Sequence, residues 1–166
     1  MQIRQLQIGN DMMQDRLMLR IASPANEECR VWITRRFLRT MWPHLCQRLQ
    51  TAPATSDKPK QEKSGNFEEP FRDENPLYPL GSKPLLASEM SFDKLNDGGV
   101  RLTFREGRER VLALDFSQEL LSALLSMFRA SAAKMEWQLP LEYGDSSPAA
   151  TPSPIPAETP PTTRLH

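Results

Sequence analysis

Apolar and polar side chains alternate along the first part of the chain in three short runs. The runs cover residues 2–8, 16–21 and 28–34. Turn-forming residues separate them, and Gly-Asn-Asp at 9–11 ends the first run. Alternation that leaves one face polar is typical of antiparallel strands with one side towards solvent. The sequence therefore predicts three antiparallel strands in this region.

The spacing of apolar residues changes after residue 34. From there to residue 49 they recur every three or four positions, which predicts an amphipathic helix. Pro43 falls inside this stretch, where it removes a backbone donor and crowds the preceding turn. Two interpretations follow: one kinked helix, or a helix that starts near Pro43. The stripe keeps its phase through Pro43, which favours the kinked helix.

The second half of the chain repeats this order of elements. Its alternating runs cover residues 86–95, 100–105 and 110–116. The Asp-Gly-Gly sequence at 97–99 predicts a hairpin, because glycine accepts the positive φ of such turns. Ser117 is a good N-cap for a helix that ends before Pro140. We therefore predict a second unit of three strands and a helix.

Proline and small polar residues dominate two segments, which cannot bury enough apolar surface to order themselves. We predict one domain over residues 1–143, built from halves 1–50 and 85–143. A flexible insertion at 51–84 separates the halves, and a disordered tail follows at 144–166. Aromatic residues in the later part of the insertion favour contact with the domain surface.

The predicted fold class is α+β, with two strand-strand-strand-helix units. Strands joined by short turns pair antiparallel, and a helix after each unit can cover the apolar face of the sheet. The units either merge into one antiparallel sheet or pack as two, with two helices on the apolar face.

Charge is distributed unevenly, although the net charge of the chain is zero. Residues 1–50 carry eight arginines and four acids, a net charge of +4, and residues 85–143 carry a net charge of −2. Cys29 and Cys46 lie among apolar residues, without the spacing of a metal site. With few cysteines, no leader and no long apolar run, we expect a cytoplasmic protein and no membrane partner.

An arginine-rich surface is the main candidate for function. Five arginines and no acid lie between Arg30 and Arg48. The candidate residues on the polar strand faces and the first helix are Arg16, Arg20, Arg30, Trp32, Arg35, Arg36 and Arg39. Arginine beside an exposed tryptophan is typical of single-stranded nucleic-acid binding, because guanidinium groups contact phosphates while the ring stacks on a base. The simpler interpretation is a solvated strand face whose arginines pair with acids of the same chain.

The second helix suggests an alternative function. Its apolar residues extend around more than one face, whereas a helix on the surface of a monomer needs only one buried stripe. Either the helix is buried on two sides or the excess forms a homodimer.

Catalytic motifs are missing from the sequence. It contains no dinucleotide fingerprint, P-loop, nucleophile elbow or HExxH zinc motif. His44 has no histidine near it in the sequence, which makes it a poor metal ligand or general base. We therefore expect no enzyme activity, no catalytic residue, no cofactor and no metal.

The stretch VWITRRFLRTMWPHL at residues 31–45 resembles a group of uncharacterised proteobacterial proteins, the YjeJ-like hypothetical proteins. These carry a V-W-[IL]-T-R-R-F signature followed by W-P, matched here by residues 31–37 and by Trp42 and Pro43. The resemblance implies a small bacterial accessory protein and no catalytic residues. The sequence as a whole thus favours a non-enzymatic binding or adaptor protein with a protein partner. The alternatives are a single-stranded nucleic-acid-binding module and a structural homodimer.

Overall fold

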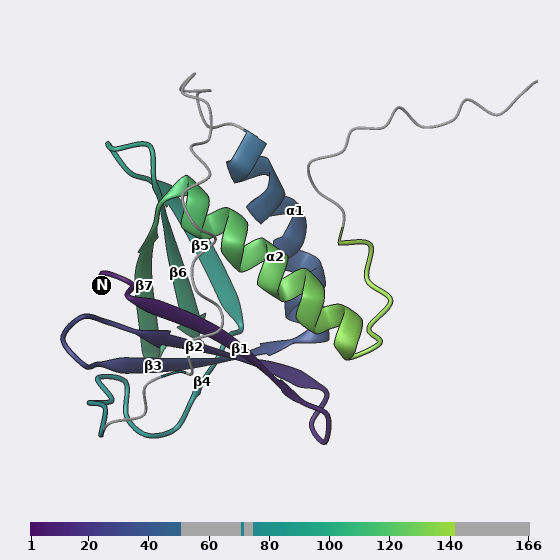
Figure 1. The fold of residues 1–166 in the computed structure, drawn as a ribbon, viewed down its shortest axis with the longest axis horizontal. Helices are drawn as coiled ribbons and strands as arrows, with labels where there is room; N and C mark the ends of the chain where they lie inside the picture. The colour runs from purple at the N-terminus through teal and green to yellow at the C-terminus, as the bar shows by residue number, and fades with distance from the viewer. Residues whose placement is uncertain (51–70, 72–74, 142–166) are drawn as a thin grey trace, which may run out of the picture.

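The computed structural model describes residues 1–50, 71 and 75–141. This part of the chain contains two β-sheets and two α-helices, which is the predicted α+β class (Figure 1). The predicted tail at 144–166 and most of the predicted insertion at 51–84 lie outside the described residues. Their predicted disorder therefore stays a prediction.

The first sheet contains four strands. They are β1 (Gln5–Asp11), β2 (Arg16–Ala22), β3 (Glu28–Thr34) and β4 (Leu85–Leu86), in the order β1-β2-β3-β4. The first three pair antiparallel as predicted, and β4 joins β3 in parallel. The predicted break at 9–11 is wrong, because β1 continues to Asp11 and its Gly9 pairs with Met18. A Cβ added at Gly9 would lie 3.9 Å from Met18 Cβ, an ordinary contact, so this position has normal strand packing, and the turn follows at residues 12–15.

The second sheet is an antiparallel meander. Its strands are β5 (Glu89–Lys94), β6 (Val100–Glu106) and β7 (Arg110–Phe116), in sequence order. The predicted single strand over 86–95 is wrong, because the chain changes sheets between β4 and β5. Ala87 N donates to Trp32 O of the first sheet (3.1 Å), and Ser88 N donates to Arg105 O of the second (2.9 Å). The hairpin between β5 and β6 is confirmed, with Gly98 at φ 84°.

One helix follows each meander: α1 (Arg35–Gln50) and α2 (Gln118–Lys134). Helix α1 begins directly after β3 and runs through Pro43, so the alternative start near Pro43 is wrong. The predicted N-cap of α2 is confirmed, because Ser117 Oγ accepts a hydrogen bond from Leu120 N at 3.2 Å. The two helices contact each other and both sheets (Figure 1).

Buried side chains from both sheets and both helices form one hydrophobic cluster. Its largest members include Trp137, Phe104, Phe116 and Phe128, all less than 2% exposed. Helix α2 packs between elements, and none of its large apolar side chains is exposed. Burial within the chain therefore accounts for its apolar excess, and the homodimer through α2 stays a prediction that no observation tests.

Candidate functional site

The polar face of the first sheet carries four of the candidate residues. In the β2–β3 register, Arg16 pairs with Thr34, Met18 with Trp32, and Arg20 with Arg30. Partners opposite each other in an antiparallel pair lie on the same face. Arg16, Arg20, Arg30 and Trp32 therefore share one face, as the alternation predicted.

Each arginine on this face stacks on an aromatic ring. The guanidinium carbon of Arg16 is 3.9 Å from the ring centroid of Trp32, and that of Arg30 is 4.5 Å from the ring of Tyr78. Arg20 lies 4.0 Å from the ring of Phe71, which is itself buried. Such cation–π contacts hold the arginine planes against the sheet. A nucleic-acid base that stacked on Trp32 from this side would have to displace Arg16.

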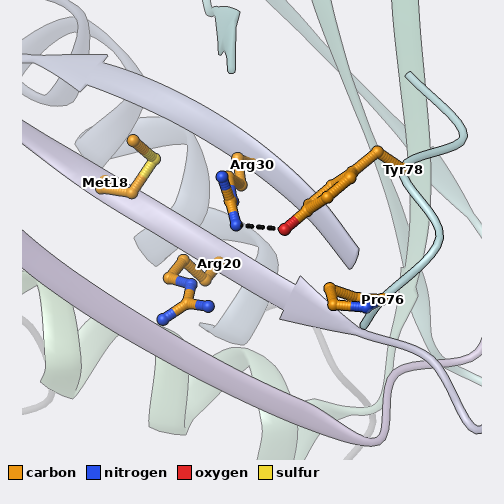
Figure 2. A pocket seen from close by; sticks show the side chains of 5 residues that line it. All are labelled: Met18, Arg20, Arg30, Pro76 and Tyr78. Carbon is orange, nitrogen blue, oxygen red and sulfur yellow. Dashed lines mark hydrogen bonds between the residues drawn. The ribbon is translucent and has the colours of Figure 1, made fainter. Parts of the chain in front are cut away.

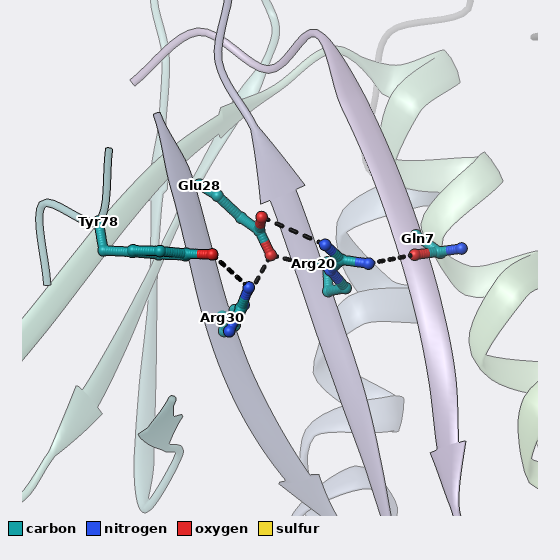
Figure 3. Close-up of polar contacts among 5 residues, drawn as sticks. All are labelled: Gln7, Arg20, Glu28, Arg30 and Tyr78. Carbon is teal, nitrogen blue, oxygen red and sulfur yellow. Dashed lines mark hydrogen bonds and ion pairs between the residues drawn. The ribbon is translucent and has the colours of Figure 1, made fainter. Parts of the chain in front are cut away.

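One carboxylate connects two of these arginines. Glu28 is buried to 1% exposure, and its Oε1 accepts from Arg20 Nε at 2.8 Å and from Arg30 Nε at 2.7 Å (Figure 3). Its Oε2 accepts from Arg20 Nη2 at 3.2 Å. The network extends outwards, where Gln7 Oε1 accepts from Arg20 Nη1 and the hydroxyl of Tyr78 accepts from Arg30 Nη2. Two positive charges thus share one negative charge.

The ionisation of Glu28 follows from this geometry. Burial on its own raises the pKa of Glu28, but the hydrogen bonds and charges of Arg20 and Arg30 outweigh it, so the pKa lies below its ordinary value of 4.5. Glu28 is therefore ionised at neutral pH. The ionised carboxylate holds both guanidinium groups in place on the face of the sheet.

A shallow cleft of about 400 Å³ opens above this network. Met18, Arg20 and Arg30 form its floor, and Pro76 and Tyr78 form its wall (Figure 2). The wall belongs to residues 75–84, which bridge to β3: Glu28 N donates to Leu77 O at 2.8 Å, and Leu77 N donates to Asn26 O at 2.9 Å. The end of the predicted insertion therefore contacts the sheet, as its aromatic residues suggested.

The remaining candidates lie where β3 becomes α1. Thr34 Oγ1 accepts from Phe37 N at 3.2 Å and caps the helix. Arg35 and Arg36 fill its first turn, and Arg39 follows one turn later; we call these three the corner arginines. All three are exposed, and the first turn contains no acid. Within the described part of the chain, no ion pair or hydrogen bond holds any of their guanidinium groups.

The structure thus divides the candidates into two sets. Glu28 holds Arg20 and Arg30, and Arg16 stacks on Trp32, whereas the corner arginines are exposed and make no ion pair or hydrogen bond within the described residues. Sequence reasoning missed Glu28, although it shares the strand and the face of Arg30. It could not pair Tyr78 or Phe71 with any arginine, because nothing in the spacing of the proline-rich segment indicates their partners.

The other potentially reactive side chains are buried or stand apart from one another. Burial raises the pKa of the Cys29 thiol to about 11, which makes it unreactive, and Trp42 is a core residue. His44 is exposed beside the ring of Phe92, with centroids 6.1 Å apart. Among the residues that the structure describes, no group of His, Cys, Asp and Glu could hold a metal ion. Neither described helix is long and apolar enough to cross a membrane.

Comparison with known proteins gives no match to a protein-family model, a curated protein or a solved structure. The resemblance to the YjeJ-like proteins therefore stays a prediction.

Proposed function

We propose that this chain is a non-enzymatic binding protein whose corner arginines dock an acidic surface of a protein partner. The observation that carries the proposal is the set of three exposed arginines at the start of α1 with no acid in the first turn. A helix N-terminus is the positive end of the macrodipole, where each added positive charge costs about 0.3–1 kcal/mol. The arginines of the first turn therefore destabilise α1, and no acid in the described chain offsets this cost. Binding of an external anion would explain why they are there.

The sheet face supports a protein partner over a single-stranded nucleic acid. Nucleic-acid modules need an aromatic face that a base can reach. Here the rings of Trp32 and Tyr78 already stack on arginines. An acidic protein surface needs only the exposed guanidinium groups, which form bidentate hydrogen bonds with carboxylates.

The test compares two anionic probes with the full chain. Fluorescence anisotropy would measure the binding of a labelled oligo-glutamate peptide and of labelled oligo-dT across a salt series. The variant Arg35→Gln/Arg36→Gln/Arg39→Gln removes the corner arginines. We expect it to weaken peptide binding about tenfold at low salt, because three charge contacts of modest strength are lost.

A matched control separates the corner from bulk charge. The variant Arg105→Gln/Arg108→Gln/Arg129→Gln removes the same charge from exposed positions on β6, the β6–β7 turn and α2. We expect its peptide affinity to fall clearly less than that of the corner variant, because the three positions lie on separate elements and form no single cluster. Equal losses in both variants would refute the proposal. Tighter binding of oligo-dT than of the peptide would favour the nucleic-acid function instead.

A further inference from the structure

The turn between β1 and β2 exposes two neighbouring methionines. Met13 is 95% exposed, more than any other large apolar side chain in the described residues, and Met12 is 67% exposed. Most apolar side chains of this size are buried in folded proteins. Two in sequence at the end of a projecting hairpin form a small apolar knob, which we call the hairpin tip together with Gln14 and Asp15.

The hairpin tip is held in a fixed conformation. Asp11 Oδ1 accepts hydrogen bonds from Met13 N and Gln14 N, each at 3.1 Å. Asp15 has a left-handed backbone at φ 48°, and its Oδ1 accepts from the indole Nε1 of Trp137 at 2.5 Å. Trp137 is 1% exposed, so this bond ties the tip to the core. A contact element that is already ordered loses little entropy when it binds.

The strand register places the hairpin tip and the corner arginines at the same end of the first sheet. Arg16, which follows the tip, pairs with Thr34 across the sheet, and Thr34 directly precedes Arg35. The hairpin projects from the end of the molecule where β3 passes into α1 (Figure 1). An apolar knob and a cluster of unpaired positive charges therefore share one end of the structure.

We propose that the hairpin tip and the corner arginines form one interface, and that the partner presents an amphipathic acidic helix. Its apolar residues would cover Met12 and Met13 while its carboxylates face the arginines. Methionine suits this contact because its flexible, polarisable side chain adapts to the shape of an apolar partner. This inference rests on the proposed function and adds the apolar half of the recognition.

The experiment uses two labelled peptides of equal charge. One is an acidic helix with leucines at i, i+3, i+4 and i+7 spacing, and in the other every leucine is replaced by glutamine. Anisotropy with the full chain should show about tenfold tighter binding of the leucine peptide, as expected when two methionines are buried. The variant Met12→Ser/Met13→Ser should abolish this preference and leave binding of the glutamine peptide unchanged.

Two controls show whether the preference for the leucine peptide depends on Met12 and Met13 in a folded protein. Val111→Ser removes an apolar side chain that is 42% exposed on β7, and it should leave the preference intact. The thermal midpoint of the methionine variant should match that of the original chain, because both side chains are exposed.

The outcomes distinguish this inference from the proposed function. If the glutamine peptide binds through the corner arginines but the leucine peptide binds no better, the hairpin inference fails and the proposed function stands. If neither peptide binds, both fail. If neither peptide binds but phosphatidylserine vesicles bind and Met12→Ser/Met13→Ser abolishes that binding, the partner is a membrane surface rather than a protein.

Discussion

The two halves of the molecule run through the same order of elements but place their arginines differently. In the second half two arginines each pair with an acid of their own, and one of them, Arg101, forms two hydrogen bonds with Asp115 across β6 and β7, at 2.6 and 2.9 Å. Arg110 pairs with Glu106 at the turn of the same hairpin. In the first half, Arg20 and Arg30 share the single buried carboxylate of Glu28.

The helices differ in the same way. Helix α2 follows the usual electrostatic pattern, with Ser117 as its cap, Glu119 in the first turn and Lys134 in the last. Helix α1 has Arg35 and Arg36 in its first turn and no acid there. The second half thus follows the usual charge pattern at its helix ends, whereas the first half places positive charge at the start of α1. This contrast is the basis for proposing that the first half binds a partner.

The largest expected effect tests the shared carboxylate. Glu28→Gln should lower the free energy of unfolding by about 2–3 kcal/mol, since charge-assisted hydrogen bonds to two partly buried arginines are lost. Asp115→Asn should change the free energy of unfolding far less, because the side chains of that pair are 46% and 35% exposed, whereas Glu28 is 1% exposed. Urea denaturation at neutral pH would measure both variants. Equal losses of unfolding free energy in Glu28→Gln and Asp115→Asn would show that the shared carboxylate stabilises the first half no more than an ordinary ion pair stabilises the second.

The pH dependence of the unfolding free energy provides a control for the role of Glu28. Its pKa is lowered in the folded chain, so its stabilising contribution is present above the ordinary value of 4.5 and is lost as the pH falls through the folded pKa. The difference in unfolding free energy between the original chain and Glu28→Gln should therefore narrow below pH 4.5. The Arg101 hydrogen bond also lowers the pKa of Asp115, but that group titrates in both proteins and cancels from the difference.

Part of this contrast could be predicted from sequence. Period-two alternation places Arg20, Arg30 and Trp32 on one face, because side chains in a strand alternate strictly between faces. Alternation within a strand does not specify which other strand pairs with it. The run at 86–95 reads as continuous, yet the chain changes sheets at Ala87 and Ser88, since both sheets need apolar residues on their inner faces.

The site was predictable to the same extent. Residue types and faces located the arginines, but their pairing depends on contacts between segments far apart in the chain. Tyr78 meets Arg30 from 48 positions away, and only the folded sheet brings them together. The exposure of the corner arginines likewise depends on how α1 packs, which periodicity does not specify.

A second prediction concerns the helix interiors. Pro43 lies inside α1 and is exposed, whereas α2 contains no proline. Pro43→Ala should raise the free energy of unfolding by about 1–2 kcal/mol, because it restores a backbone donor and relieves the crowded turn. The control Arg129→Ala, at an exposed position of α2, should change it by less than about 0.5 kcal/mol. No gain from Pro43→Ala in thermal or urea unfolding would mean that the surrounding packing already accommodates the ring.

The smallest expected effect has an unusual sign and bears most directly on function. Arg36→Glu places a negative charge at the positive end of α1, so it should raise the free energy of unfolding by about 0.3–1 kcal/mol while weakening oligo-glutamate binding. The mirror change Glu119→Arg in α2 should lower stability by a similar amount and leave binding unaffected. Differential urea unfolding at low salt, combined with the anisotropy assay, would measure both quantities. If Arg36→Glu lowers the free energy of unfolding, Arg36 stabilises the fold, and the proposal that the corner arginines form a docking site is refuted. If it stabilises the chain and reduces binding, the first half carries a stability cost that the second half avoids, and binding accounts for that cost.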